Sequence, residues 1–197
     1  MSSTPSELEE KSTMDLAVKY STWGPAHWLH TKAEVGSSVT MRVGGDFHYP
    51  NRMTDAGEKH NLLLVAGGVG VNPLASIFTH AAEAAATDKV GQVKMLYSAK
   101  SVQELIFRDK LDAITDADGT SRFGVKYFVT KETCADDDRA FHYGRITSED
   151  LKEHLEALNE LPTYCYICGP TGFIQSTDII LQALGFPKSN IFFELWW

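Results

Sequence analysis

One stretch indicates the fold class: Leu62-Leu63-Leu64-Val65-Ala66-Gly67-Gly68-Val69-Gly70-Val71-Asn72-Pro73. Its first five residues are all apolar, which is typical of a central strand buried on both faces of a parallel sheet. The glycines that follow predict a sharp turn into a helix, because glycine has no Cβ and adopts positive φ readily. Such a turn brings backbone N–H groups to the amino end of the helix, where anions bind. The stretch therefore predicts a nucleotide-binding turn.

Strands and helices alternate along the chain beyond this turn. The apolar pattern predicts strands at residues 62–66, 93–98, 126–130, 164–168 and 191–195. It predicts helices at residues 72–86, 102–114 and 171–184, the last ended by Gly185, and one more that begins at a Thr147 cap. Asn72 is expected to cap the first helix, with Pro73 at its first helical position. This alternation predicts an α/β fold, a doubly wound parallel sheet with helices on both faces.

The first part of the chain has a different pattern. Residues 15–20 and 38–43 alternate between polar and apolar, as half-buried strands do, and a short helix is expected over residues 25–31. Residues 47–60 are polar and show no period, which is typical of a domain boundary. We therefore expect a small β domain in residues 1–58 and a nucleotide-binding domain in residues 59–197.

Composition excludes several classes of function. The net charge of −8 argues against nucleic acid as the main partner, since phosphate binding needs clustered lysine and arginine. No apolar run is long enough for a membrane span, and the first residues lack the features of a signal or transit peptide. Three cysteines form no disulfide framework, and Cys165-x-x-Cys168 has no second ligand pair for a metal. We expect a soluble, intracellular protein without a metal.

A second glycine turn, Cys168-Gly169-Pro170, follows another apolar strand. Ligands bind beyond the carboxyl ends of strands in open parallel sheets, so the two turns predict one shared crevice. The alternative is that both turns serve only packing. The common G-x-G-x-x-G fingerprint is absent because Pro73 occupies its last position, and a P-loop is absent as well.

These two segments resemble the G-G-x-G-x-x-P and C-G-P segments of the ferredoxin–NADP reductase superfamily, and the resemblance covers nearly the whole chain. It implies a flavin-binding β-barrel followed by a nicotinamide-nucleotide domain. Such an enzyme passes hydride from NAD(P)H to FAD, and electrons then go to an acceptor that the sequence does not identify. The resemblance also implies a mitochondrial location.

The resemblance assigns roles to residues of this chain. Residues of the first turn would shape the pyrophosphate loop: Gly67, Gly68, Val69, Gly70, Val71, Asn72 and Pro73. Cys168, Gly169 and Pro170 would border the nicotinamide, with Cys168 near the hydride path as a shaping group rather than a nucleophile. Glu194 would take part in proton transfer. Trp196 would lie against the flavin, or else the terminal tryptophans cap an apolar edge.

Cofactor choice depends on the residues that follow two strands. By the resemblance, the adenosine ribose would lie against four residues: Ser98, Lys100, Thr130 and Lys131. Lys131 could meet a 2′-phosphate, as could Arg145, but a cation at a strand end is most often only solvated. NAD is favoured from the resemblance, and NADP is left open.

The chain departs from the family pattern in its first part. An Arg-x-Tyr/Phe-Ser segment that holds the flavin in the family is not found, and His27 or Ala26 stands where a hydroxyl is expected. We therefore expect only a partial antiparallel β-barrel remnant before the parallel sheet. An alternative function follows, a module that binds NAD(H) but has no activity of its own.

Overall fold

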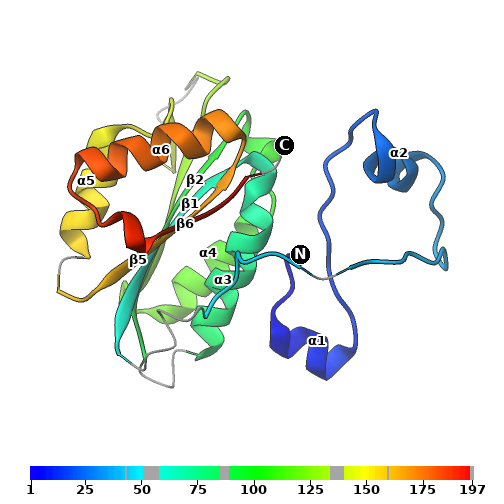
Figure 1. Ribbon diagram of the computed structural model, residues 1–197, viewed down its shortest axis with the longest axis horizontal. Helices are drawn as coiled ribbons and strands as arrows, with labels where there is room; N and C mark the ends of the chain where they lie inside the picture. Colours follow the sequence, from blue (N-terminus) through cyan, green and yellow to red (C-terminus); the bar gives the residue numbers. More distant parts are fainter. Residues whose placement is uncertain (43, 51–57, 85–88, 134–139, 159, 196–197) are drawn as a thin grey trace.

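A parallel β-sheet forms the centre of the molecule (Figure 1). The computed structural model describes residues 1–42, 44–50, 58–84, 89–133, 140–158 and 160–195. Six strands, all parallel, lie in the order β4-β3-β2-β1-β5-β6. They are β1 (His60–Gly67), β2 (Val90–Ala99), β3 (Phe123–Val129), β4 (Phe141–Tyr143), β5 (Thr163–Gly169) and β6 (Ile191–Leu195). The predicted α/β fold with a parallel sheet is confirmed.

Helices cover both faces of this sheet. One face packs against α3 (Val71–Glu83) and α4 (Arg108–Asp118), and the other against α5 (Ser148–Ala157) and α6 (Thr171–Ala183). Leu62 and Leu64 of β1 belong to the first core cluster, while Leu63 and Val65 belong to the second. All four side chains are fully buried. This two-sided burial explains why β1 is apolar without alternation.

Two predicted helix ends depend on local geometry and are confirmed. The Thr147 hydroxyl accepts a hydrogen bond from the N–H of Asp150, and the Asp150 carboxylate accepts one from the N–H of Thr147. This reciprocal pair starts α5. Beyond the end of α6, Gly185 has a φ of 82°, a conformation that glycine adopts at little cost.

Other local predictions are wrong. Asn72 does not cap α3, because the 3₁₀ turn η2 (Gly68–Gly70) runs directly into the helix and places Asn72 inside its first turn. The single helix expected at residues 102–114 is instead a 3₁₀ turn, η4 (Val102–Glu104), followed by α4. Phe107, with a φ of 64°, separates the two. Three short elements were not predicted: β4, α1 (Pro5–Lys11) and the 3₁₀ turn η5 (Lys188–Asn190).

The strands predicted in the first part of the chain are not formed. Residues 15–20 and 38–42 belong to no strand, and residue 43 lies outside the described residues. A strand needs a neighbouring strand to bond its backbone N–H and C=O groups. Residues 16–42, which we call the excursion, stand away from the sheet (Figure 1). Only the short helix is found, as α2 (Gly24–Thr31). A partial β-barrel is therefore not present among the described residues.

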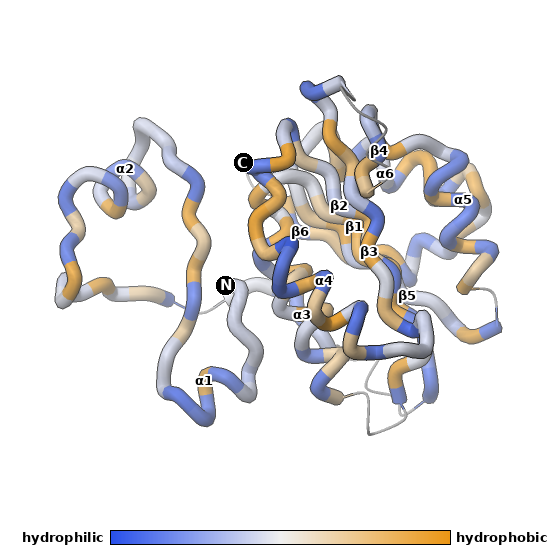
Figure 2. The backbone as a smooth tube through the Cα atoms, turned by 180° about the vertical axis from the view of Figure 1, so that it is seen from behind, coloured by the Kyte–Doolittle hydropathy of each residue, from blue (hydrophilic) through white to orange (hydrophobic). Residues whose placement is uncertain are grey.

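The excursion exposes many apolar side chains, seen as orange stretches along the tube in Figure 2. Eight large apolar residues of residues 16–41 are exposed: Leu16, Val18, Tyr20, Trp23, Leu29, Val35, Val39 and Met41. In the part of the chain that the structure describes, no helix is both long and apolar enough to span a membrane.

Candidate functional site

The candidate site lies where the order of the strands reverses. After β1 the chain builds β2, β3 and β4 to one side, whereas β5 and β6 lie on the other side of β1. The turn after β1 leads to α3 on one face, and the turn after β5 leads to α6 on the opposite face. Such a reversal is the position at which open parallel sheets bind ligands. We call residues 67–73 and 168–173, which meet here, the switch-point turns.

The switch-point turns pack backbone against backbone. A Cβ atom at Gly70 would overlap the carbonyl group of Cys168 and the amide nitrogen of Gly169. A Cβ at Gly67 would lie 3.0 Å from the ring of Phe173, and one at Gly169 would lie 2.9 Å from it. Backbone atoms therefore exclude a side chain at Gly70, whereas a side chain at Gly67 or Gly169 would need the Phe173 ring to shift. Phe173, which the sequence did not single out, makes two of these contacts, and the one with Gly67 joins residues more than a hundred positions apart in the chain.

Gly68 differs from these three glycines. Its φ is 54°, and no atom lies within 4 Å of the position that a Cβ would occupy. Its requirement for glycine is therefore conformational rather than steric. The following residues, Val71 and Pro73, lie in the first turn of α3, so the turn presents the amino end of a 13-residue helix. A helix end of this kind carries partial positive charge and free N–H groups.

Cys168 and Glu194 lie side by side. In the paired strands β5 and β6, Cys168 is opposite Glu194, and on the other side it is opposite Ala66 of β1. Cys168 is fully buried, which suits a shaping role rather than that of a nucleophile. Glu194 is half-buried. The structure thus brings these two predicted residues together, whereas Trp196 lies outside the described residues.

The Cys165-x-x-Cys168 spacing does not make a redox pair. Cys168 belongs to the core cluster under α3, and Cys165 belongs to the cluster under α5 and α6. Burial raises the pKa of the Cys165 thiol, with a smaller contribution from Asp178. Among the described residues, no group of three histidine, cysteine or acidic side chains is placed to hold a metal ion.

The residues predicted to meet the ribose lie along the ends of β2 and β3. Ser98 is opposite Gly67 in the β1–β2 ladder. The N–H of Thr130 donates to the carbonyl of Ala99, and the N–H of Lys131 donates to that of Lys100. These bonds continue the ladder past both strand ends, so Lys100 and Lys131 are held on neighbouring segments.

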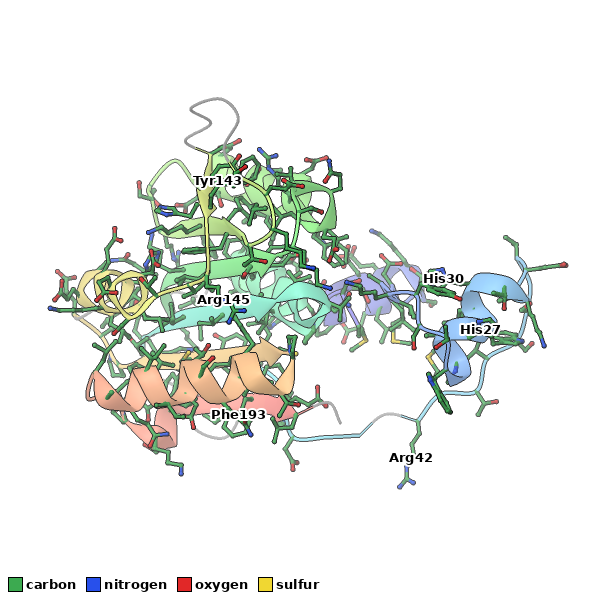
Figure 3. All side chains as sticks on the ribbon, turned by 90° about the horizontal axis from the view of Figure 1, so that it is seen from above. His27, His30, Arg42, Tyr143, Arg145 and Phe193 are labelled. Carbon is green, nitrogen blue, oxygen red and sulfur yellow. The ribbon has the colours of Figure 1, made fainter. Side chains whose placement is uncertain are left out.

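Both acidic and basic side chains lie near the carboxyl ends of β2 and β3. A hydrogen bond from Lys19 is the main cause that lowers the pKa of Glu104, and Lys100 and Lys131 add to it. Arg145, two residues beyond β4, makes no hydrogen bond or ion pair with any residue that the structure describes. In the view of Figure 3 it lies over the middle of the sheet, between Tyr143 and Phe193.

Two cavities among the described residues lie away from the switch point. One of about 460 Å³ is lined by residues such as Lys59, Asn61 and Arg122, at the amino ends of the strands. Another of about 260 Å³ lies between β3 and α5, beside Lys126 and His154. In parallel sheets ligands bind at the opposite, carboxyl edge, so neither cavity is the predicted site.

Comparison with known proteins gives a consistent result. The family of oxidoreductase NAD-binding domains matches residues 64–178. Oxidoreductase NAD-binding domain-containing protein 1 of Danio rerio is 36% identical over 203 residues, which cover 99% of this chain and 73% of that protein. The Xenopus tropicalis protein of the same name is 38% identical over 206 residues, covering 99% of this chain and 63% of the relative. The chain thus spans between 63% and 73% of the length of these relatives.

A solved structure extends the match to the fold. The flavohem-like FAD/NAD binding domain of nitric oxide dioxygenase from Vibrio cholerae superposes with a TM-score of 0.65 and 27% identity, over 87% of this chain and 64% of that one. NADH-cytochrome b5 reductase 2 of Saccharomyces cerevisiae is 29% identical over 204 residues, covering 95% of this chain and 63% of the relative. The chain therefore belongs to the oxidoreductase NAD-binding domain family, of the ferredoxin reductase type.

Proposed function

We propose that the switch-point turns bind a nicotinamide dinucleotide, with its pyrophosphate against residues 67–73 and its nicotinamide beside residues 168–170. The observation that carries this proposal is the close packing of two glycine turns where the strand order reverses. Gly68 lets the backbone turn toward the amino end of α3, and that helix end favours a phosphate. The family match supports the same ligand.

The reaction proposed for the whole protein is hydride transfer from NAD(P)H to FAD, with electrons passed on to an unidentified acceptor. The bound nicotinamide would supply the hydride. In this chain, buried Cys168 would shape the floor beside the ring, and half-buried Glu194 next to it would hold a proton. The relative from Vibrio cholerae, described as an FAD/NAD binding domain, supports this reading.

Flavin binding needs a β-barrel, and the described part of residues 1–58 does not form one. Residues 1–58 are proposed as part of a flavin domain, but residues 15–20 and 38–42 lack strand partners and expose apolar side chains. The chemistry proposed for this chain is therefore confined to the nucleotide side of the reaction. The alternative function, a module that binds NAD(H) without activity of its own, is favoured by the same observation.

Two measurements separate the two functions. Isothermal titration of NAD⁺ into the chain tests binding, and both functions require a saturable signal. Absorbance with and without added FAD, followed by NADH oxidation with a dye as acceptor, tests the enzyme. A flavin spectrum with NADH oxidation supports the oxidoreductase, whereas nucleotide binding without either supports the module. Absence of any nucleotide binding contradicts both.

Cofactor choice is proposed as NAD, with NADP as the competitor. Lys131 and Arg145 are the cations that could meet a 2′-phosphate, and Arg145 makes no ion pair with the described residues. Titration with NAD⁺ and NADP⁺ decides between them, and K131A and R145A should weaken only NADP⁺ binding if these cations meet the 2′-phosphate. The mitochondrial location stays a proposal, to be tested by fractionating cells that express the chain.

A further inference from the structure

The first residues of the chain dock on the helix that carries the first switch-point turn. Ser2, Ser3 and Thr4 are at most 5% exposed. The Ser76 hydroxyl of α3 donates to the carbonyl of Ser3 at 2.7 Å, and the Thr4 hydroxyl donates to the Glu83 carboxylate at the other end of α3 at 3.1 Å. We call residues 2–17 the N-terminal segment.

The N-terminal segment is closed by bonds between its two ends. The N–H of Ser2 donates to the carbonyl of Asp15 at 2.9 Å, and the N–H of Asp15 donates to the hydroxyl of Ser3 at 3.1 Å. Glu7 forms an ion pair with Lys110 of α4 at 3.6 Å. The segment is thus a closed loop held against two helices of the nucleotide domain.

Asn72 joins this loop to the dinucleotide turn. Its Nδ2 donates one hydrogen bond to the carbonyl of Ala17, at 2.9 Å, and a second to the carbonyl of Val69, at 3.0 Å. Both protons of the amide are therefore used, one on the N-terminal segment and one inside the turn. The side chain is 9% exposed, and its Oδ1 is buried without a hydrogen-bond partner among the described residues. A buried amide with one unpaired atom is held in place by its two donated bonds.

We infer that Asn72 is a positioning residue that couples docking of the N-terminal segment to the shape of the dinucleotide turn. The inference rests on the proposed function, since it assigns a regulation to that site. When the N-terminal segment docks, the carbonyl of Ala17 fixes the Asn72 side chain, and Asn72 then holds the carbonyl of Val69. When a dinucleotide fixes the turn, Val69 fixes Asn72, and Asn72 then holds Ala17 and the segment. Because such coupling is reciprocal, the nucleotide stabilises docking as much as docking strengthens nucleotide binding.

The test follows two backbone amides by hydrogen exchange, with and without NAD⁺. Asp15 reports docking of the segment, and Val71, whose N–H bonds to Gly68 and Val69 carbonyls, reports the turn. Asn72→Ala should speed exchange at both amides and weaken NAD⁺ binding by about 3- to 10-fold, the effect of one or two lost hydrogen bonds. Ser76→Ala loosens docking but keeps Asn72, so it should speed exchange at Asp15 and, through the intact Asn72 side chain, to a smaller extent at Val71. Amides of β1 check that each variant keeps its fold.

The variant Asn72→Ser separates the two hydrogen bonds of Asn72. If Asn72 only stabilised the fold, this variant would affect the amides of Val71 and Asp15 alike. Asn72→Ser can return one hydroxyl bond to Val69 but is too short to reach Ala17 as well. It should restore slow exchange at Val71 while Asp15 stays fast. In the wild type NAD⁺ should slow exchange at Asp15, and in Asn72→Ala this response should vanish.

Three results decide the outcome. Unchanged NAD⁺ affinity and an unchanged response of Asp15 in Asn72→Ala overturn the inference, as does NAD⁺ binding by the wild type without any effect on Asp15. If the wild type binds no dinucleotide, the proposed function fails by itself. The coupling is then judged without ligand, and it fails if Asn72→Ala speeds exchange at only one of the two amides.

Discussion

Gly70→Ala is the substitution that tests the packing of the switch-point turns most sharply. The new Cβ would overlap the carbonyl of Cys168 and the amide nitrogen of Gly169, which are backbone atoms and cannot rotate away. The φ of Gly70 is −61°, so alanine suffers no conformational strain there. The sign of the effect is therefore decided by space alone.

The magnitude follows from two opposing contributions. Overpacking of a close contact costs about 1–3 kcal/mol, and a lower entropy of the unfolded chain returns about 0.4–1 kcal/mol. The free energy of unfolding should fall by about 1–2 kcal/mol, which lowers Tm by about 2–8 °C for a domain of this size. NAD⁺ affinity should fall with it, since the turns must separate to make room.

The assay is thermal unfolding by circular dichroism, with Gly172→Ala as the matched control. Gly172 lies in the first turn of α6, and no atom lies within 4 Å of its missing Cβ. Alanine there should raise the free energy of unfolding by about 0.4–1 kcal/mol. If Gly70→Ala unfolds at or above the wild-type temperature, the two turns are not in close contact and the reasoning fails.

Two further predictions concern the site and the acid side of the stability profile. Phe173→Ala should remove the ring from Gly67 and lower the free energy of unfolding by about 1–3 kcal/mol. The loss is smaller than for a fully buried ring because Phe173 is half-buried. Urea titration measures the change, and an unchanged midpoint would contradict the contact. Burial alone raises the pKa of Asp150, but hydrogen bonds from Lys126 and Thr147 outweigh burial and lower it. Its contribution should therefore be complete above the ordinary aspartate pKa of about 3.9 and be lost as the pH falls below it, so the stability gap between wild type and Asp150→Asn, followed by urea titration from pH 7 to pH 2, should close in acid.

The sequence predicts the sheet well because its signal is local. The run Leu62–Ala66 is apolar on both faces because a layer of helices buries each face. The cap of α5 depends only on Thr147 and on Asp150, three positions later. The two glycine turns are found from sequence for the same reason. Their meeting follows from the reversal of strand order, a rule for parallel sheets rather than a property of either turn.

The failures depend on contacts between distant residues. Asn72 looks like a helix cap in sequence, but its amide is used by Val69 and by Ala17, 55 residues away. Residues 15–20 have the alternation of a strand but no neighbouring strand among the described residues. Phe173 gives no sequence signal, because its role at Gly67 exists only once the turns pack. The ribose residues Ser98, Lys100, Thr130 and Lys131 remain predictions.

The central claim is that a nicotinamide dinucleotide binds at the switch point, and hydrogen exchange of the whole chain with and without NAD⁺ tests it most directly. Protection of residues 67–73 and 168–173, with residues 60–66 of β1 unchanged, is the predicted result. Protection at the opposite edge instead, around the cavity lined by Lys59 and Arg122, would contradict the claim. So would the absence of protection anywhere at saturating NAD⁺, NADH and NADP⁺.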